Sequence, residues 1–446
     1  MPSGSRRSNG SAPAADGHKI RSEEAAVKIS NDRPLWQPSR SRVDDAVLTR
    51  FMHRVAARHG VGVADYDALH AWSVGDIASF WSEFWDFAGV IGDKGGTVLV
   101  DGDRMPGARW FPEASLNFAE NLLRSRDETD ALVFWGEDEV KNRLSHAELY
   151  RQVAHFAAAL RDLGVGRGDR VAAYMPNMPE TVVAMLATAS IGAIFTSASP
   201  DFGVQGVLDR FGQTEPRVLV AADGYHYNGK VVDGLGKLAE IARRLPSLQR
   251  VVVVPYVHQR PDIAAIPHAR LLSDFVALFA HETGIAFEQL PFDHPLYIMY
   301  SSGTTGVPKC IVHSAGGALL QHQKEHRLHA DVGPGDRLFY FTTCGWMMWN
   351  WLVSGLASGA TVLLYDGSPL VCEGDVLFDF ADAEGMTHFG TSAKFIDQLA
   401  KLGRRPIDSH SLASVRSLLS TGSPLVPEGF DYVYDAIKRD VCLSSI

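Results

Sequence analysis

One short segment of the sequence, residues 301–309, has the composition of a loop that binds phosphate. It is built from hydroxyl residues and glycines and ends in a single cation, so its candidate ligands are Ser301, Ser302, Gly303, Thr304, Thr305, Gly306 and Lys309. Glycines allow the positive-φ turns that direct backbone N–H groups toward one face, hydroxyls add donors, and a lysine neutralises phosphate charge. We therefore predict that this segment holds a polyphosphate.

The spacing separates this loop from the common P-loop. The P-loop pattern is G-x-x-x-x-G-K-[ST], whereas Gly303 and Gly306 are too close together and no Ser or Thr follows Lys309. A P-loop kinase or GTPase is therefore disfavoured. A Gly/Ser surface linker would have a similar composition, but it would not account for the strand-like runs on both sides, residues 296–300 and 310–313.

The run from Ser302 to Lys309 resembles the phosphate-loop signature of the acyl-adenylate-forming superfamily, which contains acyl-CoA synthetases, peptide-synthetase adenylation domains and luciferases. Four further segments resemble the acetoacetyl-CoA synthetase branch of that superfamily: residues 34–38, 79–85, 310–317 and 344–351. The resemblance implies an ATP-dependent acid–thiol ligase that activates acetoacetate as an acyl-adenylate. ATP, Mg²⁺ and CoA are then its expected small-molecule partners, and acetate or propionate stays open as the acid.

Roles for the loop residues follow from the resemblance by position. Lys309 and Thr304 are expected to be catalytic, and residues 301–306 with Lys309 are expected to hold the ATP phosphates. Three residues resemble the turn that lies against adenine: Gly422, Ser423 and Pro424. On their own these three would indicate only a turn. The resemblance implies no metal ligand from the chain.

The resemblance also implies which residues bind the acid. Trp346, Met347 and Met348 match a segment that borders the acyl pocket in related enzymes. Buried Trp and Met are also routine core residues, so core packing is an equally good interpretation of this segment, which continues to Trp349 and Trp351.

A histidine motif points to different chemistry. His322, Glu325 and His326 fit H-x-x-E-H, which places two imidazoles one turn apart on a helix as in inverted zinc peptidases. His329 could complete a chelate. A solvated helix face that carries Lys324 is the favoured interpretation, and we expect no tightly bound metal.

The elements that must position these residues have the pattern of an α/β fold. Short β-branched runs alternate with amphipathic helices, which predicts mostly parallel, helix-covered sheets. Strands are predicted at residues 170–174, 217–221, 250–254, 296–300, 310–313, 337–341, 361–365 and 415–419. Ser145 and Glu148 form a capping box at the start of a helix that Gly164 ends. Residues 77–85 predict a helix with one wide aromatic face.

The chain divides by composition into three parts. Residues 1–33 are rich in Ser, Gly and Arg and are predicted to be a disordered tail, with a transit peptide as the alternative. Residues 34–130 resemble the N-terminal region of acetyl-CoA synthetases. Residues 131–446 resemble the large body of the adenylate-forming fold. Family members continue into a mobile C-terminal domain, so we expect that domain to be absent and the chain to be truncated, which leaves a catalytically incomplete nucleotide-binding module as an alternative.

Composition restricts the class of protein. Of the 446 residues 46% are hydrophobic and 21% are charged, and the formal net charge is −10. An acidic surface repels polyphosphate, so nucleic-acid binding is not expected. The 4 cysteines form no C-x-x-C pair, and no apolar stretch is long enough for a membrane span. The sequence therefore predicts a cytoplasmic globular enzyme, and it leaves the oligomeric state open.

Overall fold

The computed structural model describes residues 34–137, 139–301 and 306–445. The chain divides into two compact units, residues 1–37 and residues 38–446. All of the elements below belong to the larger unit. The tail predicted at residues 1–33 lies outside the described residues.

The first of two large sheets, sheet 1, has seven strands in the order β13-β12-β9-β7-β8-β15-β16. Neighbouring strands are parallel except β15 and β16, which form an antiparallel pair at one edge. The strands are β7 (Arg170–Tyr174), β8 (Ile194–Ala198), β9 (Val218–Ala222), β12 (Arg250–Val254), β13 (Ala269–Leu271), β15 (Pro295–Tyr300) and β16 (Cys310–Ser314). The phosphate-type loop therefore connects the two strands of an edge hairpin.

The second large sheet, sheet 2, repeats this plan. Its order is β21-β20-β19-β17-β18-β5-β6, and again only the edge pair, β5 and β6, is antiparallel. The strands are β5 (Asp130–Gly136), β6 (Val140–Ser145), β17 (Arg337–Tyr340), β18 (Thr361–Asp366), β19 (His388–Ser392), β20 (Ser417–Thr421) and β21 (Cys442–Ser445). The predicted parallel, helix-covered sheets are confirmed, and all eight predicted strands are present with ends shifted by at most two residues.

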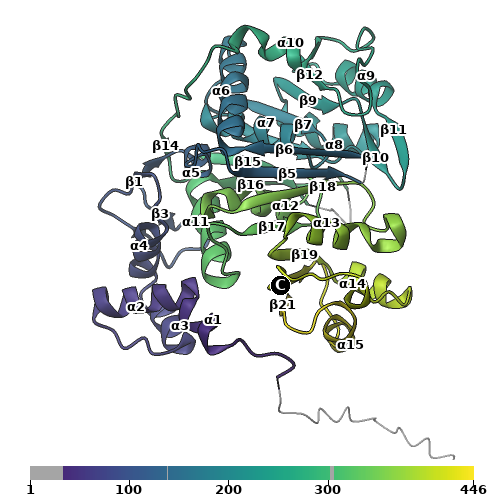
Figure 1. Ribbon diagram of the computed structural model, residues 1–446. Helices are drawn as coiled ribbons and strands as arrows, with labels where there is room; N and C mark the ends of the chain where they lie inside the picture. Colours follow the sequence, from purple (N-terminus) through teal and green to yellow (C-terminus); the bar gives the residue numbers. More distant parts are fainter. Residues whose placement is uncertain (1–33, 138, 302–305, 446) are drawn as a thin grey trace, which may run out of the picture. The chain divides into compact units, whose positions relative to one another are not determined.

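Alternation along the strands explains the layers. In β12, Val251 and Val253 pack on one side with α8 (Val204–Thr214) and α9 (Leu235–Arg244), while Val252 and Val254 face the opposite side. Sheet 2 alternates in the same way, and its outer face packs against α13 (Val376–Glu384) and α14 (Ala393–Lys401). Because a buried parallel strand must be apolar on both faces, β9 and β12 are almost uninterrupted runs of Val, Leu and Ala. Figure 1 shows the two sheets with helices around them.

Helices fill the space that the two sheets share. They are α6 (His146–Asp162), α7 (Pro179–Ser190), α11 (Ala315–Lys324) and α12 (Met347–Val353), and α7 contacts strands of both sheets. The capping box of α6 is confirmed, since Glu148 N donates to Ser145 Oγ at 3.2 Å and Ser145 N donates to Glu148 Oε2 at 3.1 Å. Gly164 follows the helix at φ 75°, a conformation that favours glycine.

The N-terminal helices carry the aromatic cluster. They are α1 (Arg40–Asp45), α2 (Val47–His59), α3 (Tyr66–Gly75) and α4 (Ile77–Ala88). Phe80, Phe84 and Trp85 of α4 are buried as the spacing predicts, whereas Ile77 at the first turn is exposed. The buried carboxylate of Glu83 accepts from Arg54 Nε, and His59 Nε2 lies 3.2 Å from it. A buried charge of this kind needs such partners.

Short elements complete the unit. The minor strands are β1 (Gly92–Asp93), β2 (Leu99–Val100), β3 (Arg109–Trp110), β4 (Ser115–Leu116), β10 (Gly224–Tyr227), β11 (Lys230–Asp233) and β14 (Leu290–Pro291). The remaining α-helices are α5 (Phe118–Leu122), α10 (Leu272–Val276) and α15 (Pro427–Tyr432). Tighter or wider helical turns are η1 (Ala277–Phe279), η2 (Glu325–His329), η3 (Ser354–Ser358), η4 (Val371–Gly374), η5 (Pro406–Asp408) and η6 (Val433–Ile437).

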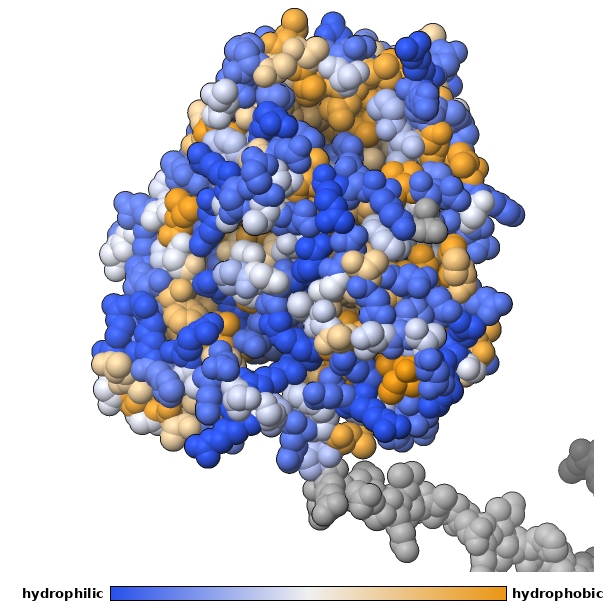
Figure 2. Space-filling model, in the orientation of Figure 1, coloured by the Kyte–Doolittle hydropathy of each residue, from blue (hydrophilic) through white to orange (hydrophobic). Residues whose placement is uncertain are grey.

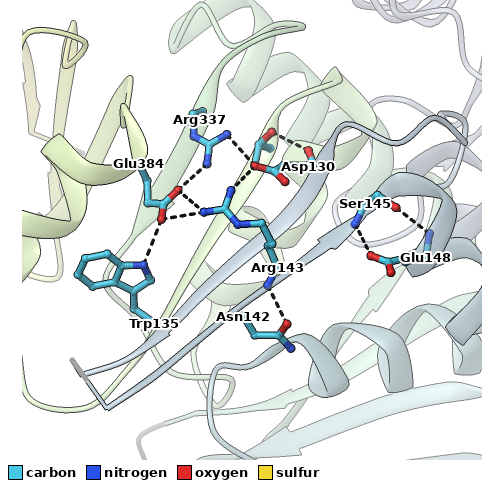
Figure 3. A network of polar contacts seen from close by, with 9 residues as sticks. Asp130, Trp135, Asn142, Arg143, Ser145, Glu148, Arg337 and Glu384 are labelled. Atoms are coloured by element: carbon cyan, nitrogen blue, oxygen red, sulfur yellow. Dashed lines mark hydrogen bonds and ion pairs between the residues drawn. The ribbon is translucent and has the colours of Figure 1, made fainter.

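A charged cluster fastens the edge hairpin of sheet 2 to its centre (Figure 3). Arg143 of β6 and Arg337 of β17 both donate to Asp130 Oδ2, at 2.8 and 3.2 Å. Both arginines also donate to Glu384 of α13, and Trp135 Nε1 donates to the same carboxylate at 3.3 Å. Asp130 and Arg337 begin parallel strands, so the cluster lies at the amino edge of sheet 2.

The surface is mixed in character. On the face drawn in Figure 2 it is mostly hydrophilic, with hydrophobic residues in small groups. Within the described residues no helix combines the length and the apolar character that crossing a bilayer requires.

Candidate active site at the carboxyl edges of the two sheets

The hairpin geometry sets the two ends of the phosphate-type loop side by side. Ser301 N donates to the carbonyl of Lys309 at 2.9 Å, and Lys309 N donates back to Ser301 Oγ at 3.1 Å. Gly306 has φ 91°, and a Cβ added there would meet no atom within 4 Å, so only the backbone conformation requires glycine at this position. The predicted residues Ser302, Gly303, Thr304 and Thr305 lie outside the described residues.

The loop leaves the carboxyl end of β15, which runs parallel to β8. Ligands of open α/β sheets bind beyond the carboxyl ends of the parallel strands. Gln213 of α8 supports the loop from outside, because its Nε2 donates to the carbonyl of Pro308 at 2.8 Å. The side chain of Lys309 is exposed, so an anion can reach it from solvent.

A cavity of about 620 Å³ lies between α11 and α12, and we call it the α11–α12 cavity. Its wall includes Met347, Met348 and Trp351 from α12 and Thr421 from the end of β20. The remaining lining residues are Val312, His313, Ser314, Gly317, Ala318, Gln321, His322 and Glu325. This volume lies in the range of small-molecule sites.

In the segment from Trp346 to Trp351, some residues fit core packing and others fit the wall of an acyl pocket. Trp349 and Trp351 are buried and belong to the core. Met347 and Trp346 are 41% and 59% exposed, so core packing does not explain them. Met347 and Met348 border the α11–α12 cavity, but Trp346 is not among its lining residues. The acyl role of all three stays a prediction.

The predicted adenine turn follows β20 directly. Gly422 has φ 91°, and Gly422, Ser423 and Pro424 are all exposed. Thr421, the last residue of β20, lines the α11–α12 cavity. The turn therefore begins at the wall of the cavity that the two methionines border, although these residues are far apart in the sequence.

A second cavity, of about 630 Å³, opens where the carboxyl ends of both sheets face each other, and we call it the inter-sheet cavity. Residues at or just after the carboxyl ends of β7, β8, β17, β18 and β19 line it, among them Asn177, Asp201, Thr342, Asp366 and Lys394. Sequence reasoning missed this cavity, because strands from distant parts of the chain form it and no local motif marks it.

Asp366 is the unusual group of the inter-sheet cavity. Tyr256 donates its hydroxyl to Asp366 Oδ2 at 3.1 Å. Burial, with smaller contributions from the nearby carboxylates of Glu137 and Asp201, raises the pKa of Asp366 to about 7, although the Tyr256 hydrogen bond opposes the shift. Perturbed carboxyls of this kind gather at functional sites, but they also occur in structural networks.

The histidine motif does not form the arrangement that a zinc peptidase needs. His322 is bonded through Nδ1 to Ser354 Oγ at 2.8 Å, and the ring of His326 packs on Trp351 with centroids 4.2 Å apart. Glu325 accepts from Gln321 Nε2 at 2.9 Å. Among the described residues no three His, Cys, Asp or Glu side chains come together as a metal site.

Our interpretation of this stretch as a solvated helix face is wrong for both histidines of the motif. His322 is 5% exposed and His326 is fully buried. A π-helical turn, η2, follows α11 and changes which side chains point inward. Of the three histidines in the stretch, only His329 is exposed.

Comparison with known proteins agrees with this geometry. The family described as AMP-binding enzyme matches residues 118–442, and the family described as acetyl-coenzyme A synthetase N-terminus matches residues 66–122. The acetoacetyl-coenzyme A synthetase of Rhizobium meliloti is 56% identical over 93% of this chain and 64% of that protein. The acetoacetyl-CoA synthetase of Danio rerio is 46% identical over 95% of this chain and 64% of that protein.

A solved structure extends the likeness to the fold. The acetoacetyl-CoA synthetase from Streptomyces lividans has a TM-score of 0.86 and 44% identity, over 93% of this chain and 64% of that one. The chain thus spans about 64% of the length of the relatives that it matches.

Two parallel sheets around a shared helical layer, with a phosphate-type hairpin loop at the carboxyl edge, define the adenylate-forming α/β fold. The chain belongs to the AMP-binding enzyme family.

Proposed function

We propose that this chain supplies the nucleotide-binding and acid-binding body of an acetoacetate–CoA ligase, which uses ATP to join acetoacetate to CoA through an acyl-adenylate. The observation that carries the proposal is the position of the loop, the α11–α12 cavity and the Gly422 turn at strand carboxyl ends. The relatives that are named as acetoacetyl-CoA synthetases support it over most of this chain.

The chemistry requires two displacements. A carboxylate oxygen of the acid attacks the α-phosphorus of ATP, so that a P–O bond forms and pyrophosphate leaves. The thiolate of CoA then attacks the acyl carbon, a C–S bond forms, and AMP leaves. Adenylation is needed because AMP is a far better leaving group than hydroxide.

The residues of this chain contribute mostly position and charge. Loop amides and hydroxyls would hold the phosphates, and Lys309 would neutralise the charge that builds up on them. Met347 and Met348 would enclose the acyl chain in the α11–α12 cavity. Mg²⁺ would enter with ATP as its counter-ion, and we assign it to no residue of the chain. Location in the cytoplasm stays a prediction.

Acid-dependent exchange of labelled pyrophosphate into ATP tests this function. Because the relatives are longer, the assay is run on the chain alone and on the chain joined to the part of the Rhizobium meliloti protein that it does not match. Acetoacetate, acetate and propionate are compared, and ATP binding is measured by calorimetry. Exchange that acetoacetate supports best is the expected result. A preference for acetate or propionate would reassign the acid, and absence of both exchange and ATP binding would refute the proposal.

A further inference from the structure

A hydrogen-bond chain behind the α11–α12 cavity fixes the tautomer of His322. Ser354 Oγ lies 2.7 Å from the carbonyl oxygen of Asn350, which can only accept, so the hydroxyl hydrogen points there. Nδ1 of His322 lies 2.8 Å from the same Oγ. Since that hydroxyl has already used its hydrogen, Nδ1 must carry the proton and donate.

The other ring nitrogen is then an acceptor. Burial lowers the pKa of His322 to about 3, with a smaller contribution from His313, so the ring is neutral at physiological pH. Among the described residues Nε2 has no hydrogen-bond partner. This atom is also not completely buried, so a ligand can reach it. His322 borders the α11–α12 cavity, so this is the space from which Nε2 is reached. The carboxylate of Glu325, a second acceptor, borders the same cavity.

We propose that Nε2 of His322 accepts a hydrogen bond from the end of the acid that lies away from its carboxylate, in the α11–α12 cavity. The cavity then selects short acids that carry a hydrogen-bond donor on C3 or on the atom that replaces C3's substituent. This inference rests on the proposed function and deepens it. The acids concerned carry a 3-hydroxyl group, a terminal amide, or the enol hydroxyl of a 3-keto acid. Ser354 is a positioning residue, because it acts only through the tautomer that it imposes on His322.

A keto oxygen can only accept a hydrogen bond, whereas an enol hydroxyl can donate one to Nε2. Tautomerisation moves one proton from C2 to the C3 oxygen, and no co-reactant is needed. C2 of a 3-keto acid lies between two carbonyl groups, so the enol form is accessible. Because only the enol would bind, the apparent affinity of the acid is reduced in proportion to the enol fraction. A hydroxy acid or an amide pays no such cost. The cavity should therefore bind them although neither is a keto acid.

The test compares two acids of nearly equal size. Malonamate carries amide N–H donors, whereas monomethyl malonate offers acceptors only. Pyrophosphate exchange should show at least about a tenfold lower KM for malonamate, because a buried acceptor left without a donor is penalised. 3-Hydroxybutyrate should likewise have a lower KM than butyrate.

Two variants separate the acceptor from general packing. His322→Asn keeps an N–H for Ser354 but has no atom in the place of Nε2, and it should reduce the malonamate preference to about twofold or less. Ser354→Ala frees the ring to adopt the other tautomer, and it should move the preference toward monomethyl malonate. The control His329→Asn, at an exposed histidine of the same stretch, should retain the wild-type preference.

A measurement without turnover completes the test. Nitrogen NMR of labelled imidazole, with His322→Asn for assignment, should show the Nδ1–H tautomer in the wild type and a shift toward Nε2–H in Ser354→Ala. Exchange activity without discrimination between malonamate and monomethyl malonate, or an Nε2–H tautomer in the wild type, would overturn this inference and leave the ligase proposal intact. Loss of exchange with every acid would instead count against the ligase proposal itself.

Discussion

The hydroxyl of Tyr256 donates to Oδ2 of Asp366 at 3.1 Å, which joins the loop after β12 of sheet 1 to the end of β18 of sheet 2. Each residue follows or ends a parallel strand of its own sheet. The contact therefore couples the two carboxyl edges at the inter-sheet cavity, and its carboxyl group is the one whose pKa burial raises to about 7.

Asp366 should make the folded protein less stable as the pH rises. The unfolded chain ionises this carboxyl near pH 4, whereas the folded protein does so near pH 7, so the folded state binds the extra proton in between. Its stabilising contribution is complete below about pH 4 and is lost as the pH rises through 7. The free energy of unfolding of Asp366→Asn should exceed that of the wild type by roughly 1–3 kcal/mol at pH 8 and by little at pH 4.5.

Urea unfolding of both proteins at the two pH values measures this difference. Asp103→Asn, at an exposed carboxylate that does not line this cavity, is the control and should be neutral. Equal destabilisation by Asp366→Asn at both pH values would mean that the Tyr256 hydrogen bond, and not ionisation, dominates.

Lys309→Ala should weaken ATP binding by about 1.5–3 kcal/mol, because a cation that faces several phosphate oxygens is removed. Calorimetric titration with ATP reports the loss. Lys230→Ala, at an exposed lysine in β11, controls for a general change in surface charge. If ATP affinity and exchange rate both stayed at the wild-type level, Lys309 would have no part in the reaction.

Met348→Ala should shift the substrate preference toward longer acids, since it enlarges the α11–α12 cavity and each accommodated methylene is worth on the order of 1–3 kcal/mol. Exchange rates for acids from acetate to hexanoate give the profile. Met386→Ala, at a fully buried methionine outside both cavities, should lower stability without reordering the acids. An unchanged rank order in Met348→Ala would assign this residue to packing alone.

Glu384→Gln should destabilise the protein by about 1–2 kcal/mol, because Arg143 and Arg337 then lose one of their two carboxylates. The expected effect is modest since the side chain of Arg143 is 55% exposed. The midpoint of urea unfolding measures the effect. Glu240→Gln breaks an exposed pair with Arg244 and should change stability by less than about 0.5 kcal/mol. A similar small change in Glu384→Gln would show that the cluster in Figure 3 is energetically minor.

Local periodicity was sufficient to predict the strands that are rich in branched residues, such as β12, and the helix that Ser145 caps. It failed for β19, whose sequence from His388 to Ser392 contains Gly390 and little β-branched character. That segment becomes a strand because β17 and β20 pair with it on both sides. Tertiary pairing therefore decided what propensity could not.

The candidate site divides in the same way. A contiguous motif predicted the phosphate-type loop, and resemblance indicated the methionines and the Gly422 turn. The partners of His322 could not be predicted, because Ser354 meets it only after α11 and η3 pack together. Asp366 had no signal either, since its surroundings come from both sheets.

The arrangement of strands in sheet 2 has a consequence for synthesis on the ribosome. β5 lies between β6 and β18, and Thr361 Oγ1 bonds to the carbonyl of Asp130 across 231 residues of sequence. The strands of sheet 1 all come from the stretch between these two ends. As the chain emerges, the β5–β6 hairpin must wait with one apolar edge unpaired until β18 has been made. During that interval the nascent protein exposes a strand edge with which other chains could pair, so this hairpin gains from being shielded until β18 arrives.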